Sequence, residues 1–164
     1  MTTLKKLLAA DALAREVSAR QARGERIVFT NGVFDILHVG HARYLAEARA
    51  LGDALIVAVN TDASVRRLKG DLRPIVCENE RAELLAALAC VDYVTLFDTP
   101  TPVPLLEIVR PLIYAKGGDY TEAELPEAPV ARGWGGDVRI LSLVQGRSST
   151  NIIEKICAAY GHQK

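Results

Sequence analysis

The stretch that decides the fold covers residues 26–41 and reads Arg26-Ile-Val-Phe-Thr-Asn-Gly-Val-Phe-Asp-Ile-Leu-His-Val-Gly-His41. Its apolar start predicts a short buried strand over 26–30, followed by a turn at Asn31-Gly32. His38–His41 then begins a helix that runs to Leu51 and stops at Gly52. A strand that leads into a helix N-terminus presents free backbone N–H groups and the positive end of the helix dipole. Such a terminus suits an anion, and polyphosphate is the commonest biological example.

The two histidines of this stretch predict how the anion is held. His38 and His41 are three residues apart, so we expect both imidazoles on one face of the first helical turn. Gly40 has no Cβ, which lets a phosphate lie close to the backbone while both rings donate to its oxygens. The pattern indicates a nucleoside triphosphate held by its phosphates. The alternatives are a metal pair, for which no third ligand of suitable spacing follows, and plain surface histidines.

The string Thr30-Asn-Gly-Val-Phe-Asp-Ile-Leu-His-Val-Gly-His41 resembles the H-x-G-H signature of the cytidylyltransferase-like nucleotidyltransferases. Within that superfamily, residues of about 24–157 are most similar to the D-glycero-β-D-manno-heptose 1-phosphate adenylyltransferases, which many bacteria carry fused behind a sugar kinase. A length of 164 residues suits one domain, so we expect a stand-alone form without the kinase. The expected organisation is one nucleotidyltransferase domain over 1–164, with an N-terminal helix over 1–23 and the family core over 24–157.

Charge and composition exclude several kinds of partner. Twenty Lys and Arg balance twenty Asp and Glu, so no net field draws the chain to nucleic acid or to an anionic membrane. Hydrophobic residues make up 49% of the chain but occur in runs too short to span a bilayer. Cys77, Cys90 and Cys157 share no metal-like or C-x-x-C spacing. We therefore expect a cytoplasmic protein whose cysteines are small apolar fillers.

Strands and helices are predicted to alternate along the rest of the chain. We expect a helix from Leu4 to about Arg23, strands over 54–60, 93–97, 112–115 and 138–144, and helices over 61–68, 79–89, 102–110 and 151–160. Thr101-Pro102 predicts an N-cap followed by proline at the first helical position. Residues 121–136 are the least regular, with room for one short helix. The pattern predicts a single α/β domain with a Rossmann-like, doubly wound parallel sheet of five strands and helices on both faces.

Polar clusters follow the predicted strands, where ligands of such sheets bind. The four clusters are Thr30-Asn31, Asn60–Asp62, Lys116–Asp119 and Gly146–Thr150. Because the carboxyl ends of parallel strands meet at one edge of a sheet, we expect all four clusters to lie at that edge.

The resemblance implies adenylyl transfer from ATP to a sugar 1-phosphate, with release of pyrophosphate. The attacking phosphate monoester has a second pKa of about 6, so it is anionic at neutral pH and needs no general base. The protein has to position two polyanions and neutralise developing charge, tasks that suit histidines, cations, helix N-termini and a divalent ion. We expect Mg²⁺ to accompany ATP, held mainly by phosphate oxygens and by no dedicated protein ligand.

The resemblance also implies roles for individual residues. His38, His41 and Lys69 are the expected catalytic residues, and Lys69 and Arg73 belong to a basic loop that relatives fold over the phosphates. The expected nucleotide-binding residues are Thr30, Asn31, Gly32, Phe34, Gly40, Lys116, Gly118, Asp119, Ser148, Ser149 and Thr150. The expected residues near the sugar phosphate are Asp35, Asn60, Asp62 and Arg73. The structural alternatives are a solvated loop around Lys69, a simple N-cap at Ser148–Thr150 and a turn at Asp119.

One departure from a neighbouring branch bears on the choice of nucleotide. Leu143 stands where glycerol-phosphate cytidylyltransferases have the leading arginine of R-T-x-G-I-S-T-T, which favours the adenylyl branch. We therefore expect ATP and D-glycero-β-D-manno-heptose 1-phosphate to give ADP-heptose for the lipopolysaccharide core. Apolar residues of the N-terminal helix and the Pro/Gly segment indicate a homodimer. The alternatives are a glycerol-3-phosphate cytidylyltransferase-like enzyme, a flavin adenylyltransferase, and a nucleotide-binding module without catalysis.

Overall fold

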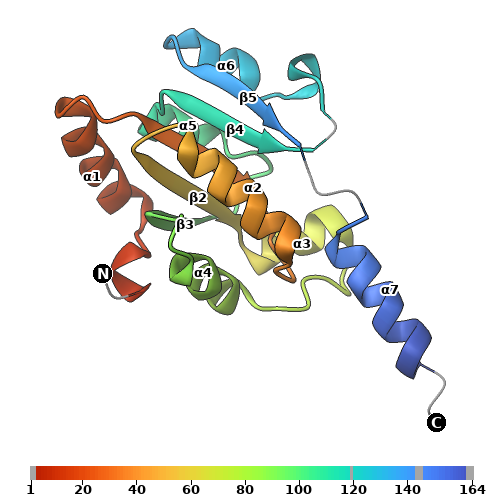
Figure 1. Ribbon diagram of the computed structural model, residues 1–164. Helices are drawn as coiled ribbons and strands as arrows, with labels where there is room; N and C mark the ends of the chain where they lie inside the picture. Colours follow the sequence, from red (N-terminus) through yellow and green to blue (C-terminus); the bar gives the residue numbers. More distant parts are fainter. Residues whose placement is uncertain (1–2, 119, 143–145, 162–164) are drawn as a thin grey trace.

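A sheet of five parallel strands, in the order β3-β2-β1-β4-β5, organises the chain (Figure 1). The computed structural model describes residues 3–118, 120–142 and 146–161. Its elements are η1 (Thr3–Lys6), α1 (Ala10–Ala22), β1 (Ile27–Gly32), α2 (Val39–Ala50), β2 (Ala54–Asn60), α3 (Asp62–Lys69), α4 (Glu78–Ala87), β3 (Tyr93–Phe97), α5 (Val103–Val109), β4 (Ile113–Gly117), η2 (Glu122–Glu124), α6 (Ala128–Gly133), β5 (Asp137–Leu141) and α7 (Ser149–Tyr160). The predicted Rossmann-like, doubly wound fold is confirmed. The strand order reverses between β1 and β4, and ligands of such sheets bind at this point.

Two hydrophobic layers enclose the sheet, because successive side chains of a strand point to opposite faces. Ile27 and Phe29 of β1 pack in the layer that α1, α5 and α6 cover, whereas Val28 packs in the layer under α2 and α4. All residues of β2 are buried, as expected for a parallel strand covered on both faces. The sheet therefore forms a rigid base from which the loops at the strand ends project.

The N-terminal segment differs from the single helix expected from Leu4 to Arg23. Residues Thr3–Lys6 form a 3₁₀ turn, and Leu7 forms a parallel β-bridge with Val94 of β3. The helix begins only at Ala10. The backbone N–H of Leu8 donates to the Val94 carbonyl at 3.0 Å. The edge of β3 offers unpaired backbone groups, and pairing with them outweighs the helical preference of this segment.

The end of β1 also differs from the expectation. Asn31 and Gly32 continue the strand instead of forming the turn. The turn falls at Phe34, whose φ of 51° places it in the left-handed region that non-glycine residues rarely occupy. His38 lies just outside α2 as its N-cap.

Most other predicted elements agree with the structure to within a few residues. Thr101 is not the N-cap of α5: Pro102 holds that position, without a side-chain cap, and the Thr101 carbonyl accepts a hydrogen bond from the Thr99 hydroxyl. The irregular segment 121–136 holds η2 as well as α6. The last strand ends at Leu141, and residues 143–144 of its predicted range lie outside the described part of the chain.

Two packing expectations need correction. Cys77 and Cys157 are exposed, so only the partly buried Cys90 fits the role of an apolar filler. Leu13 and Val17 of α1 are buried against the sheet of their own chain, so they do not supply the dimer surface inferred from the sequence. No helix among the described residues is long and apolar enough to cross a membrane.

Candidate functional site

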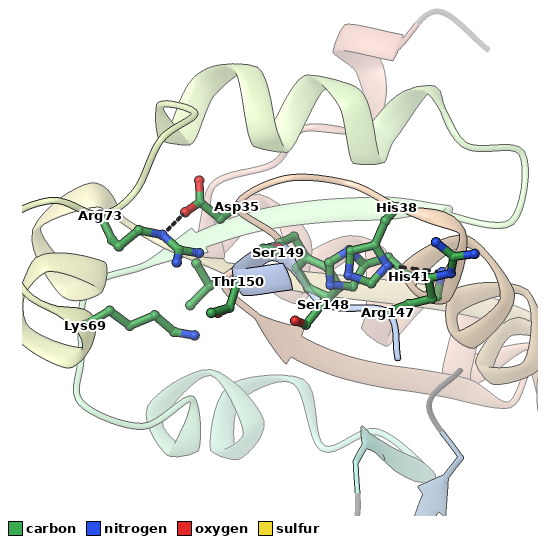
Figure 2. Close-up of a pocket in the computed structure, with 12 residues that line it drawn as sticks. Asp35, His38, His41, Lys69, Arg73, Arg147, Ser148, Ser149 and Thr150 are labelled. Atoms are coloured by element: carbon green, nitrogen blue, oxygen red, sulfur yellow. Dashed lines mark hydrogen bonds and ion pairs between the residues drawn. The ribbon is translucent and has the colours of Figure 1, made fainter. Parts of the chain in front are cut away.

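A cavity opens where β1 ends, between the N-termini of α2 and α7 (Figure 2). We call it the main cavity, and its volume is about 250 Å³. It is lined by Val33, Phe34, Asp35, His38, Gly40, His41, Lys69, Arg73, Arg147, Ser148, Ser149 and Thr150. The fold therefore brings the histidine motif, the basic loop and the serine-rich motif to one place.

His38 and His41 form a stacked pair at the start of α2. The ring centroids lie 3.9 Å apart, and the ring of Phe34 meets His41 edge-on at 5.2 Å. Nδ1 of His38 accepts a hydrogen bond from the Gly40 N–H at 3.1 Å. Because Nδ1 is an acceptor, the proton of the neutral His38 ring lies on Nε2, which is then a donor for an anion.

The environment keeps both imidazoles neutral near pH 7. Burial, together with repulsion from His38, lowers the pKa of His41 to about 4. Burial and the nearby positive charge of Arg147 lower the pKa of His38. A neutral imidazole still donates one N–H hydrogen bond. The pair can therefore bind phosphate oxygens without carrying buried charge in the free protein.

Gly40 is required for the position of the His38 ring. A Cβ at Gly40 would lie 2.9 Å from Cε1 and Nδ1 of His38, closer than nonbonded carbon atoms approach. It would also lie 3.6 Å from Cβ of Arg147. The glycine therefore makes room for the imidazole against the helix, in addition to the close phosphate approach that the sequence suggested.

The serines at the start of α7 have different roles. The Ser148 side chain caps the helix by accepting the Asn151 N–H at 3.0 Å, which confirms the predicted cap. The Ser149 hydroxyl donates to the Ile36 carbonyl at 3.1 Å and accepts from the Ile36 N–H at 3.4 Å. Ser149 therefore joins α7 to the loop after β1. Thr150 is exposed and lines the main cavity.

Asp35 anchors the basic loop beside the cavity. Its Oδ2 accepts from Nε of Arg73 at 2.5 Å, and its Oδ1 accepts from the backbone N–H groups of Ile75 and Val76 at 2.7 and 3.0 Å. Burial opposes ionisation, but the donors from Val76, Arg73 and Ile75 outweigh it and hold the pKa of Asp35 below its usual value. The charge of Arg73 is thus already paired, and Asp35 holds the loop in place.

Two other cations face the main cavity. Lys69 ends α3, and Arg147 precedes the N-cap of α7. Within the described part of the chain, neither makes an ion pair or a side-chain hydrogen bond. Arg147 was not singled out from the sequence, although a cation directly before a helix N-cap was a usable signal.

A second, smaller cavity adjoins the first at the point where the strand order reverses. Its volume is about 140 Å³, and it is lined by Asn31, Gly32, Val33, Phe34, His41, Tyr44, Lys116 and Gly117. Oδ1 of Asn31 accepts from the Tyr114 hydroxyl at 2.9 Å and lies 3.4 Å from Nζ of Lys116. Burial lowers the pKa of Lys116, although nearby Glu127 opposes the shift. We call this space the strand-end cavity.

Tyr44 lines the strand-end cavity and was not predicted from the sequence as a site residue. Its hydroxyl donates to the Ala115 carbonyl at 3.1 Å and shares a hydrogen bond with the hydroxyl of Thr30. Thr30 is fully buried and lines neither cavity. Its hydroxyl therefore acts indirectly, by holding the Tyr44 hydroxyl through their shared hydrogen bond.

Asn60 and Asp62 lie at the same edge of the sheet but do not line the main cavity. Asn60 donates to Oγ of Ser64 at 3.0 Å, and Asp62 accepts from Arg81 at 2.7 Å. Arg81 is fully buried and also donates to the carbonyls of Val33 and Val76. Arg81 therefore joins the loop after β1, through Val33, to the start of α3 after β2, through Asp62.

Gly118 lies directly after β4 and lines neither the main cavity nor the strand-end cavity. Gly118 is buried with a φ of 142°, and its N–H donates to the Leu141 carbonyl at 3.2 Å. Asp119 and Leu143 lie outside the described residues. Nowhere in ranges 3–118, 120–142 and 146–161 do three His, Cys, Asp or Glu residues gather closely enough to hold a metal ion.

The fold and the cavities define a Rossmann-like α/β protein with a cavity at its strand ends that histidines, cations and two helix N-termini line. The family model described as cytidylyltransferase-like matches residues 29–155. The chain belongs to the cytidylyltransferase-like family, which confirms the expected enzyme class of nucleotidyltransferase.

This chain is similar in sequence to one part of several longer proteins. A protein named bifunctional protein HldE from Geobacter sulfurreducens is 52% identical over 153 residues, which cover 93% of this chain and 31% of that protein. The protein of the same name from Geotalea uraniireducens is 55% identical over 146 residues, which cover 89% of this chain and 30% of that protein. The chain thus spans less than a third of the length of these relatives. A solved structure of a lipopolysaccharide core biosynthesis protein from Thermoplasma volcanium is 36% identical, with a TM-score of 0.62, and covers 76% of this chain and 100% of that one.

Proposed function

We propose that this chain transfers the adenylyl group of ATP to D-glycero-β-D-manno-heptose 1-phosphate, giving ADP-heptose and pyrophosphate for lipopolysaccharide core synthesis. The observation that carries the proposal is the convergence of the α2 and α7 N-termini on the main cavity (Figure 2). The resemblance of the whole motif to heptose 1-phosphate adenylyltransferases supports the choice of substrates. The similar solved structure is of a lipopolysaccharide core biosynthesis protein, which supports the proposed pathway.

The residues of the main cavity suit in-line transfer between two polyanions. The attacking phosphate oxygen is already anionic, with a second pKa of about 6, so the site has no need of a catalytic base. Asp35, the one carboxylate that the described residues contribute to the lining, is engaged with the basic loop. His38 and His41 would donate N–H groups to the α-phosphoryl oxygens, and Lys69 would neutralise charge on the phosphates.

Mg²⁺ fits this site as a companion of ATP. Asp35 is the one carboxylate in the described lining of the main cavity, and both of its oxygens already accept hydrogen bonds. The described lining therefore offers the ion no free carboxylate. Phosphate oxygens would then supply most of its ligands. When bound, the ion would neutralise phosphate charge, while His38, His41 and Lys69 act on the same phosphates.

The experiment that tests the proposal is a product screen by mass. The chain is incubated with each nucleoside triphosphate, Mg²⁺ and a panel of sugar 1-phosphates, glycerol 3-phosphate and flavin mononucleotide. ADP-heptose should form, and pyrophosphate release should need both substrates. CDP-glycerol or FAD as the main product would replace the proposal with one of the other transferases. Tight ATP binding without any product would indicate a binding module.

Two further expectations accompany this proposal. A homodimer remains a prediction, and sedimentation equilibrium of the chain would give the mass of twice the monomer if it holds. The cytoplasmic location also remains a prediction, based on the cysteine pattern.

A further inference from the structure

A buried carboxylate lies near the strand-end cavity without lining it. Glu127, the N-cap residue of α6, is 4% exposed, and its Oε2 has no hydrogen-bond partner within the described part of the chain. A carboxylate in such a place has lost most of its hydration, and a nearby cation is the usual compensation.

The sheet places the cation Lys116 on the same side as Glu127. Side chains two residues apart on a strand share a face, so Lys116 follows Tyr114 into the layer that α6 covers. Figure 1 shows α6 against β4 and β5. The pairing of β1 with β4, continued by two residues, sets Asn31 opposite Lys116. We call Asn31, Tyr114, Lys116 and Glu127 the strand-end cluster.

Lys116 has N–H donors that the cluster leaves unused. An ammonium carries three donors. In the described structure its one hydrogen bond is the long contact of 3.4 Å to Oδ1 of Asn31, an oxygen that also accepts from the Tyr114 hydroxyl. Because Lys116 lines the strand-end cavity, its other donors can serve a ligand there.

Glu127 is the charged group that acts on Lys116. The other titratable groups of the described residues that face Lys116 are His41, Tyr44 and Tyr114, and its aligned neighbour on β5 is Ile140. These three are neutral near pH 7, because burial lowers the pKa of His41 to about 4 and raises the pKa of both tyrosines. Burial lowers the pKa of Lys116 as well, and the negative charge of Glu127 opposes this shift.

The strand-end cavity is within reach of a nucleotide in the main cavity. Val33, Phe34 and His41 line both spaces. A nucleotide whose phosphates lie in the main cavity can therefore turn its α-phosphate or its nucleoside toward Lys116. Both parts carry oxygen or nitrogen acceptors for an ammonium.

We propose that Glu127 is a positioning residue, which keeps the ammonium of Lys116 charged and directed at the strand-end cavity, where Lys116 donates to an acceptor atom of the nucleotide. The inference rests on the proposed function, which identifies this nucleotide as ATP. It gives a role to a carboxylate that touches no ligand itself.

Competitive acetylation of the full chain tests the charge of Lys116, because acetic anhydride reacts with the neutral amine. Peptide mass spectrometry follows the rate at Lys116 against pH. In Glu127→Gln, which keeps the size of the side chain, the midpoint should move to lower pH by about one unit. Glu127→Asp withdraws the charge by one methylene, so its midpoint should lie between those of wild type and Glu127→Gln. Glu107→Gln, at an exposed position of α5, is the matched control. An unchanged midpoint in the Glu127 variants would overturn the inference.

Calorimetry of ATP with Mg²⁺ across a range of pH is the second readout. In Glu127→Gln the affinity should stay within about 2-fold of wild type below both midpoints and fall at a lower pH than in wild type. Equal loss of affinity at every pH would indicate a purely structural role and overturn the inference. Lys116→Met should weaken ATP binding about 10-fold at neutral pH.

AMP and adenosine locate the acceptor atom. Weaker binding of AMP alone in Lys116→Met would assign the contact to the α-phosphate, and weaker binding of both would assign it to the nucleoside. Either result supports the inference, whereas unchanged binding of ATP, AMP and adenosine would overturn it. Absence of ADP-heptose formation by wild type would contradict the proposed function alone, because acetylation and binding do not depend on turnover.

Discussion

At the scale of single residues, the site depends on two imidazoles that are close together and partly buried. His41 packs between His38 and Phe34, and its Nδ1 has no hydrogen-bond partner in the described structure. Such a ring is poorly solvated and resists protonation. The same burial that keeps it neutral holds the ring in place in the lining of the main cavity.

Replacing His41 should affect the chemical step more than the fold. In His41→Ala we expect kcat to fall about 100-fold or more, because a donor to the transition state is lost. Steady-state rates of ADP-heptose formation would show the change, and circular dichroism would show an intact fold. An unchanged kcat would mean that His41 only packs against Phe34.

The titration of His41 is a second prediction at this scale. Its pKa of about 4 lies below the ordinary histidine value of 6.5, so the unfolded chain binds more protons than the folded chain between these pH values. The free energy of unfolding should therefore fall as the pH is lowered from 6.5 to 4. NMR titration of the His41 ring should give a midpoint near 4. A midpoint at 6.5 would show that the ring is solvated.

At the scale of elements, Asp35 connects the end of β1 to the loop between α3 and α4. One carboxylate holds Arg73 and two backbone N–H groups, so a single side chain positions the loop over the main cavity. Its side chain is 1% exposed and that of Arg73 is 15% exposed, so solvent screens this pair little.

Removing the Asp35 carboxylate should therefore destabilise the protein. We expect Asp35→Ala to lower the free energy of unfolding by about 3 kcal/mol, because the charge of Arg73 loses its buried partner. Urea denaturation measures the loss. Asp71→Ala, which removes an exposed carboxylate from the same loop, is the control. Equal stability of the two variants would contradict the anchoring role.

At the scale of the whole molecule, α7 is attached to the domain by its first turn. None of its residues is buried, and Figure 1 shows it extending away from the sheet. The Ser149 hydroxyl joins this turn to Ile36 through two hydrogen bonds. Local opening of α7 is thus expected to need less free energy than opening of the sheet.

Loss of the Ser149 hydroxyl should loosen α7 selectively. In Ser149→Ala, amide hydrogen exchange in α7 should become about 10-fold faster, while exchange in β1 and β2 stays as in wild type. Exchange followed by mass spectrometry resolves the two regions. The control is Ser18→Ala, at an exposed position of α1. Unchanged exchange in α7 would show that Ser149 does not anchor the helix.

The sequence by itself determined the alternation of strands and helices, the parallel sheet and the position of the histidine motif at a strand end. These features depend on local periodicity and on residues close together in the chain, such as His38 and His41. Even so, pairing with the edge of β3 converted the expected start of the N-terminal helix into an extended segment. Local propensity does not include such contacts.

Only the tertiary structure decided which distant polar residues share a cavity and which are used by the fold. Asp35 and Asp62 are both acidic residues near strand ends, yet each is bound to an arginine from a later part of the chain. Arg147 lies far from the histidine motif in sequence but lines the same cavity. Ion pairing and burial depend on where the chain returns in space, so residue type and spacing alone do not reveal them.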